Sequence, residues 1–276
     1  MKINKITVIF YSATGNTRKV ITRIAKNVQE VLQVPINYIN YTRPQNRQAS
    51  YSFGKDELVL FASPTYAGRI PNKMLPYVKS AFSGDSTPAI PIVVYGNRNF
   101  DNSLSELTGI LSSNGFIPFA GAAIATVHAF SSKIGTNRPD EKDLQQIDSF
   151  CKSASEYILN SENIVPIEVP GEYPIVNYYT PLGLDNEPVN FLKAKPKTIK
   201  ELCDNCGACA KACPMSAIDF TDNTLVPGTC IKCQSCVKIC HSKAKYFDDA
   251  KFISHVLMLE DHYVRRSEPS FFLPLK

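Results

Sequence analysis

The sequence reads CDNCGACAKACP at residues 203–214 and CIKCQSCVKICH at residues 230–241, and these two runs hold eight of the nine cysteines. Both runs have the spacing C-x2-C-x2-C-x3-C. Three thiolates spaced by two residues can wrap around one iron–sulfur cube, and the fourth lies far enough along the chain to reach a second cube. The spacing therefore predicts two [4Fe–4S] clusters, with Cys203, Cys206, Cys209 and Cys240 as ligands of cluster 1, and Cys230, Cys233, Cys236 and Cys213 as ligands of cluster 2.

Zinc sites and disulfide frameworks fit these runs less well. Zinc ligands come as cysteine pairs with a longer gap between them, and disulfide frameworks belong to oxidising compartments and short secreted chains. Residues 198–248 closely resemble two-cluster clostridial-type ferredoxins. One position departs from that family, because His241 follows the last cysteine of the second run where the family usually has proline.

The length of 276 residues indicates about two domains. No apolar stretch is long enough for a transmembrane helix, so we expect no membrane insertion. Residues 1–5 lead directly into a strand-like segment without a cleavage site, so we expect no signal peptide. Together with oxygen-sensitive clusters, these features favour the cytoplasm of an anaerobe.

Residues 1–160 alternate between strand-like and helix-like patterns. The predicted strands are 5–11, 36–40, 57–62, 90–95 and 116–127, and the predicted helices are 17–32, 71–82, 103–114 and 139–160. Strands such as 8–10 and 59–61 are apolar on both faces, which suits a buried parallel sheet. Five such units predict a doubly wound α/β domain with a five-stranded parallel sheet.

The loop after the first strand, residues 12–17, joins that strand to the start of a helix, where free N–H groups and the helix dipole favour an anion. No lysine follows, so the loop is not a Walker motif, and GxGxxG is absent. This neutral, hydroxyl-rich loop resembles the flavodoxin loop that binds the FMN phosphate; an ordinary capped turn is the alternative. The resemblance implies non-covalent FMN binding by Ser12, Thr14, Gly15, Asn16 and Thr17.

Two further loops follow strand ends, where ligands of open α/β sheets bind. Residues 63–71 resemble the flavodoxin loop that covers one flavin face, although Tyr66 would serve equally as a core residue. In residues 95–100, Asn97 is expected at the flavin pyrimidine edge or in plain turn chemistry. We expect Arg98 to stabilise reduced flavin, unless it is solvated or ion-paired. The expected flavin contacts here are Pro64, Thr65, Tyr66, Gly68, Tyr95, Gly96, Asn97, Arg98 and Phe100, with His128 after the fifth strand as a further contact or as a satisfied loop histidine.

The triplets GNR at 96–98, HAF at 128–130 and RPD at 138–140 resemble an anaerobe family that fuses a flavodoxin-like domain to a two-cluster ferredoxin, the flavoferredoxins. The resemblance spans nearly the whole chain and implies FMN and two [4Fe–4S] clusters in one electron carrier with redox partner proteins. The expected parts are a flavodoxin-like domain (1–160), a proline-rich connection (161–196), a small α+β ferredoxin domain (197–248) and a C-terminal helix and tail (249–276).

Two other functions remain open at this point. The ferredoxin part could feed an FMN enzyme that reduces a small molecule such as a quinone, or the flavodoxin-like part could be a scaffold without flavin. An open pocket beside His128 would favour the enzyme. The sequence shows no nucleophilic set typical of a hydrolase, and Cys151 is expected to be a buried structural thiol.

Charge argues against nucleic-acid binding. The formal net charge of +5 falls to roughly −1 when each cluster and the FMN phosphate contribute about −2, and no lysine-rich stripe compensates. The connection contains six prolines and several aromatic residues, so we expect a semi-rigid segment that lies across both domains. In the tail we expect a docked helix whose buried face carries Ile253, Val256, Leu257 and Val264.

Overall fold

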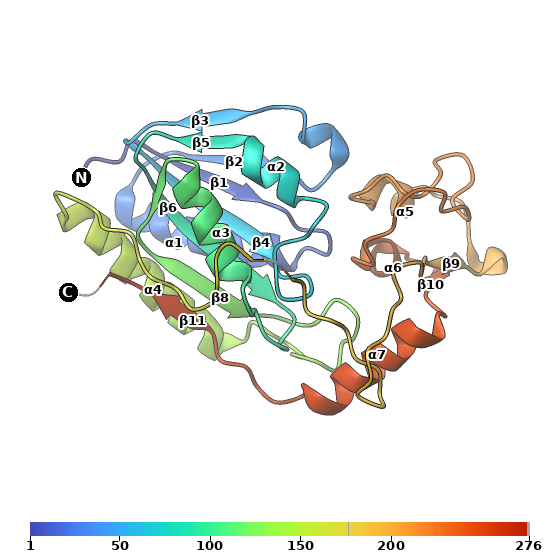
Figure 1. Cartoon of the computed structure of the whole chain (residues 1–276). Helices are drawn as coiled ribbons and strands as arrows, with labels where there is room; N and C mark the ends of the chain where they lie inside the picture. The colour runs from blue at the N-terminus through green and yellow to red at the C-terminus, as the bar shows by residue number, and fades with distance from the viewer. Residues whose placement is uncertain (176, 275–276) are drawn as a thin grey trace.

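The computed structural model describes residues 1–175 and 177–274 (Figure 1). Val176 of the proline-rich connection and residues 275–276 of the tail lie outside the described residues. No helix within the described ranges has the length and the apolar character needed to span a membrane.

A parallel sheet forms the centre of the large domain. Among the described residues this sheet has seven strands, because the short β7 (Phe116–Pro118) pairs in parallel with β6 and an antiparallel strand lies at one edge. The five main parallel strands lie in the order β2 (Ile36–Asn40), β1 (Lys5–Phe10), β4 (Glu57–Pro64), β6 (Thr87–Tyr95) and β8 (Gly121–Ala125). Numbered among themselves, these strands follow the order 2-1-3-4-5 of the flavodoxin-like fold. The prediction of a doubly wound five-stranded parallel sheet is therefore confirmed. All nine residues of β6 are buried, as expected of a central strand with both faces covered.

Helices cover both faces of the sheet. One face packs against α1 (Asn16–Leu32) and α4 (Glu141–Asn160), and the other packs against α2 (Leu75–Ser80) and α3 (Ser103–Ser113). The helix α4 begins with a capping box between Asp140 and Asp143. Cys151 in α4 is fully buried, and burial, followed by the charge of Asp148, raises the pKa of its thiol to about 12.

Three details of the large domain differ from the sequence-based expectation. The predicted strand 116–127 is two strands, β7 (Phe116–Pro118) and β8, because Pro118 lacks an N–H group and the next two residues turn into the core. The predicted helix 71–82 is only α2, since Pro76 is tolerated only in a first helical turn. Two short strands that the sequence did not indicate, β3 (Tyr51–Phe53) and β5 (Phe82–Gly84), pair in parallel.

The small domain lies beside the end of the sheet that is opposite the N-terminus (Figure 1). It contains two one-turn helices, α5 (Ala208–Ala212) and α6 (Ser235–Ile239), and a short antiparallel pair, β9 (Lys197–Thr198) with β10 (Lys245–Tyr246). Each helix carries the third cysteine of one run. Little regular structure surrounds them, which is consistent with a domain organised by metal ligands.

The proline-rich connection contacts both domains. Tyr178 donates a hydrogen bond to the Ile70 carbonyl oxygen at 3.1 Å, and its ring lies 4.3 Å from the Arg69 guanidinium. At its other end, Lys195 Nζ donates to the Val226 carbonyl oxygen at 2.7 Å. The segment therefore links the loop after β4 to the small domain.

The tail returns to the large domain after α7 (Ala250–His262) and adds β11 (Ser270–Phe272) antiparallel to β8 at the edge of the sheet. The predicted buried face of α7 is wrong: Ile253, Leu257 and Val264 are 41%, 43% and 63% exposed. The buried residues are Phe252, His255, Met258 and Leu259. Phe252 determines this orientation because it packs among the rings of Phe130, Phe191 and Phe247.

Candidate redox centres

Four thiols of the small domain converge on one cavity. Cys213 from the first run lines it together with Cys230, Cys233 and Cys236 from the second run. The rest of the lining is mostly apolar, with Lys232, Gln234 and Ser235 as its polar residues. A fourth cysteine that crosses to the other run is the arrangement that the spacing predicts for cluster 2. The donor set is four soft ligands around one enclosed space, which fits an iron–sulfur cube.

Burial opposes the thiolate form of these cysteines. Burial, followed by the charges of Cys230 and Cys213, raises the pKa of Cys236 to about 12. Burial also raises the pKa of Cys233 well above its usual range, and Cys236, Cys213 and Cys230 add to that shift. A cationic metal centre would offset this cost and hold all four cysteines as thiolates.

The other four cysteines of the two runs differ in their exposure to solvent. Cys206 is exposed and Cys209 is buried. Burial raises the pKa of Cys209, and the charge of Cys203 acts in the same direction. His241, which follows Cys240, has its Nε2 atom 2.9 Å from Asp204 and lies beside Cys206. The end of the second run therefore adjoins the start of the first, as the predicted ligand set of cluster 1 requires.

The two runs fold as equivalent loops. The amide N–H of Ala217 donates to Cys213 Sγ at 3.3 Å, and that of Ala244 donates to Cys240 Sγ at 3.2 Å. Each donor stands four residues after the last cysteine of its run. Corresponding residues also share a left-handed backbone: Asn205 with Lys232, Gly207 with Gln234, and Ser216 with Lys243. Hydrogen bonds to sulfur help to set cluster potentials, so both expected clusters receive similar backbone support.

A buried lysine lies between the runs. The ammonium group of Lys245 donates to Thr198 Oγ1 at 2.7 Å and to the Asn223 carbonyl oxygen at 2.5 Å, and the residue is 3% exposed. Burial raises the pKa of Cys209 and of Cys236, and the positive charge of Lys245 offsets part of this rise in both. The sequence analysis missed Lys245, because no motif marks it and lysines are ordinarily exposed.

The first loop of the large domain presents free amides. Gly15, with φ of 92°, turns the chain into α1 at Asn16. Within residues 1–175 and 177–274, no acceptor is found for the N–H groups of Ala13, Thr14 and Gly15. The first turn of α1 adds Thr17 and further N–H groups without intrahelical partners. This arrangement fits a phosphate group.

Two side chains of this loop have structural partners. Ser12 Oγ accepts a hydrogen bond from the Arg18 N–H at 3.0 Å, which is the capping role that the alternative interpretation assigned to it. Asn16 Nδ2 donates to the Val127 carbonyl oxygen at 2.9 Å, so its amide ties the loop to the segment after β8. Thr14 remains the most available hydroxyl for a phosphate oxygen.

The second loop of the large domain, residues 63–71, turns sharply at Ala67 and Gly68, with φ of 48° and 78°. A Cβ atom at Gly68 would lie 2.5 Å from Asp101 Oδ2, so glycine is required there. Backbone hydrogen bonds between Tyr66 and Arg69, of 2.7 and 3.2 Å, close the turn. Pro64 ends β4, and Thr65 follows it with its hydroxyl on Ser103, so the loop has a fixed shape before any ligand binds.

The third loop of the large domain, residues 95–100, is held by hydrogen bonds to the C-terminal tail. Asn97 is buried, and its Nδ2 atom donates to the carbonyl oxygens of Tyr263 at 2.8 Å and Arg265 at 2.6 Å. Its Oδ1 atom accepts from the Ser267 N–H at 3.2 Å. We expected Asn97 at the pyrimidine edge of a flavin, but both ends of its amide serve the tail. The reason is that residues 263–268, remote in sequence, fold over this loop. Tyr95 likewise donates to the Glu268 carbonyl oxygen at 3.3 Å.

Arg98 in the same loop forms an ion pair with Asp101, and its guanidinium lies 4.0 Å from the ring centroid of Tyr179. This is the ion-paired alternative, and the carboxylate neutralises most of the charge that was expected to act on a flavin. The ring of Phe100 packs on Tyr95, with 5.6 Å between centroids.

His128 is a satisfied loop histidine. A Cβ atom at Gly96 would lie 2.3 Å from its ring, so the two loops touch. The Phe130 N–H donates to His128 Nδ1 at 3.0 Å. Burial, followed by the charges of His255 and Lys238, lowers the pKa of His128 to about 3. The ring is therefore neutral near pH 7 and is a poor proton donor to a substrate.

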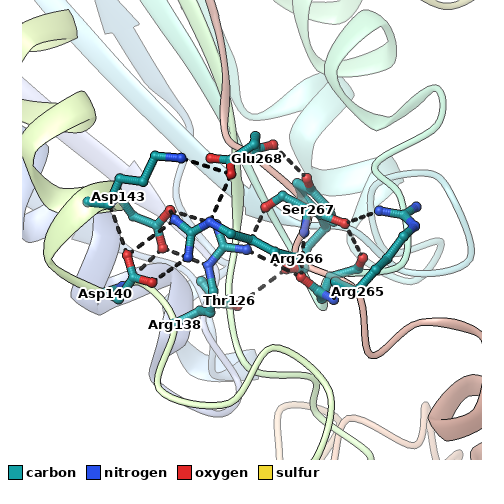
Figure 2. Close-up of polar contacts among 11 residues, drawn as sticks. Thr126, Arg138, Asp140, Asp143, Arg265, Arg266, Ser267 and Glu268 are labelled. Carbon is teal, nitrogen blue, oxygen red and sulfur yellow. Dashed lines mark hydrogen bonds and ion pairs between the residues drawn. The ribbon is translucent and has the colours of Figure 1, made fainter.

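A buried ionic network fastens the tail to the large domain (Figure 2). Arg138 donates to both carboxylate oxygens of Asp143, at 2.7 and 2.6 Å, and to the Ser267 carbonyl oxygen at 2.5 Å. Arg266, from the tail, donates to Asp143 at 2.7 Å and pairs with Asp140. The fully buried carboxylate of Asp143 thus pairs with one arginine from the large domain and one from the tail.

The small domain docks beside the loops of the large domain. Ile231, between two cysteines of the second run, packs against the apolar cluster that includes Tyr11. Arg47 donates a hydrogen bond to the carbonyl oxygen of Pro214, which follows Cys213. The wall that Pro214 and Ile231 form in the cavity of the second cysteine set therefore faces the large domain.

Comparisons with known proteins give a family match for the small domain. Residues 202–244 match the family model of the 4Fe-4S dicluster domain, and this range includes both cysteine runs. No match was found among curated proteins. Among solved structures, a short-chain flavodoxin associated with a non-canonical PDU bacterial microcompartment is 12% identical, with 58% of this chain and 100% of that chain covered and a TM-score of 0.42.

Two other solved structures are similar over the same share of the chain. A flavodoxin from the domain Archaea is 14% identical, with 56% and 99% of the two chains covered and a TM-score of 0.37. The NADH:FMN oxidoreductase EMOB, in its apo form, is 14% identical, with 58% and 91% covered and a TM-score of 0.40. By its strand order and its dicluster match, the chain joins a flavodoxin-like α/β domain to a ferredoxin-like 4Fe–4S domain, which supports an electron-transfer or redox role.

Proposed function

We propose that this chain is an electron carrier that binds one FMN and two [4Fe–4S] clusters and passes electrons between them. The dicluster match and the converging thiols support the clusters, and the free amides of the first loop support the FMN phosphate. When bound, the clusters exchange single electrons and the flavin can hold one or two.

The position of the second cysteine set carries this proposal. Tyr66 belongs to the loop expected to cover one flavin face. Tyr66 and Ile231, which stands between Cys230 and Cys233, pack against the same apolar cluster of the large domain. Burial raises the pKa of the Tyr66 phenol well above the usual range, and the charges of Cys233 and Cys230 add to that shift. A cluster ligand and a flavin loop are therefore neighbours across the domain interface, which is the short separation that electron transfer needs.

The residues of this chain have distinct roles in the proposed flavin site. The N–H groups of residues 13–17 and the Thr14 hydroxyl would hold the phosphate, while Thr65, Tyr66 and Gly68 would form the wall beside the small domain. Asn97 and Arg98 act indirectly, because they hold the third loop against the tail and Asp101. Among the described residues, no acceptor is found for the N–H groups of Gly96, Asn97 and Asn99, so these groups would orient the ring.

The carrier is favoured over an enzyme by the state of His128. Its ring lies against Gly96, its Nδ1 atom accepts a hydrogen bond from the Phe130 N–H, and it is neutral near pH 7, so it has no ready proton for a substrate. We therefore assign redox proteins as donor and acceptor. The proposed clusters are sensitive to oxygen and need thiolate ligands, which fits a cytoplasmic location.

Rapid mixing under anoxic conditions tests the proposal. Oxidised protein is mixed with a substoichiometric amount of reduced methyl viologen, and iron–sulfur and flavin absorbance are followed separately. We expect cluster bleaching first and flavin reduction afterwards, at a rate independent of protein concentration. Flavin reduction that occurs only through collisions between molecules would contradict an internal route. Quinone turnover as fast as this internal step would favour the enzyme.

A further inference from the structure

Two tyrosines of the large domain face the second cysteine set. Tyr11 is fully buried directly after β1, and its hydroxyl makes no hydrogen bond of ordinary geometry among the described residues, although the Tyr66 hydroxyl lies near it. Tyr66 packs against it edge-on, with 6.4 Å between ring centroids and 80° between ring planes. A buried hydroxyl without an acceptor is rare in native proteins and calls for an explanation.

The groups opposite these phenols belong to the small domain. Ile231 and Met215 pack against the apolar cluster that contains Tyr11, and Arg47 fixes the Pro214 carbonyl beside it. Ile231 stands between Cys230 and Cys233 in the sequence. The sulfur of Cys233 is near enough for its charge to act on both phenols. Thiol ligands of the expected cluster 2 thus lie on the small-domain side of the two phenols.

We propose that Tyr66 and Tyr11 donate O–H hydrogen bonds, directly or one through the other, to sulfur atoms of cluster 2, and that the large domain thereby raises the reduction potential of a cluster bound by the small domain. This inference rests on the proposed function, since it requires that cluster 2 is present. Hydrogen bonds to cluster sulfurs are one of the main determinants of cluster potential. They stabilise the reduced cluster more than the oxidised one because the added electron increases the negative charge on sulfur.

The proposal gives the two clusters different positions in the order of electron transfer. Cluster 2 lies against the flavin loops and has donors from both domains, whereas cluster 1 has the exposed Cys206. Cluster 1 is then the point of exchange with a partner protein, and cluster 2 is the last step before the flavin. The tyrosines keep their protons during transfer, because burial, as the first cause, raises the pKa of each.

The test uses the full-length protein with Tyr66→Phe and Tyr11→Phe. Tyr41→Phe is the matched control, because the Tyr41 hydroxyl is also buried and without a partner among the described residues, but no cysteine acts on it. Iron, sulfide and FMN contents are measured first, so that a missing cluster, which would refute the proposed function, is recognised separately. Potentials are then obtained from redox titrations followed by electron paramagnetic resonance.

We expect Tyr66→Phe to make one of the two cluster potentials more negative, by about 59 mV if the equilibrium constant for reduction falls tenfold. Tyr11→Phe should shift the same potential in the same direction, and Tyr41→Phe should shift neither. Equal potentials in all four proteins would overturn the proposal. If a variant does not accumulate, exchange of the wild-type protein into heavy water supplies the second measurement. Deuterium replaces the hydrogen of both the backbone amides and the phenols, and each hydrogen bond to sulfur shifts the iron–sulfur vibrational frequencies. A shift larger than the amides cause supports the phenol hydrogen bonds. A shift no larger than the amides cause overturns the proposal.

Discussion

Replacement of Arg138 by methionine is the sharpest test of the joint between tail and sheet. The side chains of Arg138 and Asp143 are 4% and 0% exposed, and methionine keeps the apolar part of the arginine while removing its charge. Loss of one partner from a buried ion pair costs about 3–5 kcal/mol, because the other charge stays buried. Asp143 retains Arg266, so we expect Arg138→Met to lower the free energy of unfolding by about 3 kcal/mol, at the low end of this range.

Denaturant titration under anoxic conditions measures this loss. The chain has no tryptophan, so far-ultraviolet circular dichroism is the appropriate signal. Arg23→Met is the matched control, because Arg23 also pairs with an aspartate, Asp148, but the two side chains are 43% and 37% exposed. An exposed pair of this kind contributes about 0–1 kcal/mol.

Equal losses in the two variants would refute the reasoning, since burial would then have no effect on the cost of the broken pair. Arg138→Met should also release the tail, because the same guanidinium holds the Ser267 carbonyl oxygen. Limited proteolysis should therefore cut residues 263–269 in this variant and not in Arg23→Met.

Three further predictions concern the sites. Thr14→Ala with Thr17→Ala should weaken FMN binding by roughly 1.5–3 kcal/mol for each hydroxyl that contacts the phosphate, while riboflavin binding stays unchanged. Calorimetric titration of the apoprotein with both ligands measures this. Equal losses for the two ligands would exclude a phosphate loop. Cys213→Ala should remove the cluster held by Cys230, Cys233 and Cys236 and leave the other cluster intact, which iron analysis and electron paramagnetic resonance can show; loss of the other cluster instead would disprove the crossing. The pKa of His128 is lowered from 6.5 to about 3, first by burial, so the unfolded chain takes up a proton before the folded one as pH falls, and stability should decrease progressively from pH 6.5 towards 3. Denaturant midpoints at pH 7.5 and pH 5, compared with His128→Gln, measure this, and an identical decrease in the variant would assign the effect to other groups.

The elements that could be predicted are those whose sequence pattern lies within a single short segment. Apolar strands such as Val59–Phe61 and the helical repeat of Val20, Ile24 and Val28 carry their own periodicity, so the order of strands and helices followed from the sequence. The cysteine runs are equally local, because ligand spacing alone restricts which metal centre can form.

The parts that could not be predicted depend on contacts between distant residues. The strand Ser270–Phe272 has only three residues, and nothing in them indicates pairing with β8. The amide of Asn97 turns towards residues more than 160 positions away, and the buried face of α7 is set by an aromatic cluster rather than by the apolar repeat. Tyr11 and Lys245 gain their importance only when the two domains and the two runs are brought together.

The most direct measurement of the central claim is the cofactor content of the protein purified without oxygen. Iron, acid-labile sulfide, zinc and flavin are determined on the same sample, together with its visible spectrum. Two four-iron clusters and one flavin predict about eight iron atoms, about eight sulfide ions and about one FMN per chain. Zinc without sulfide, or clusters without any flavin even after incubation with FMN, would contradict the account.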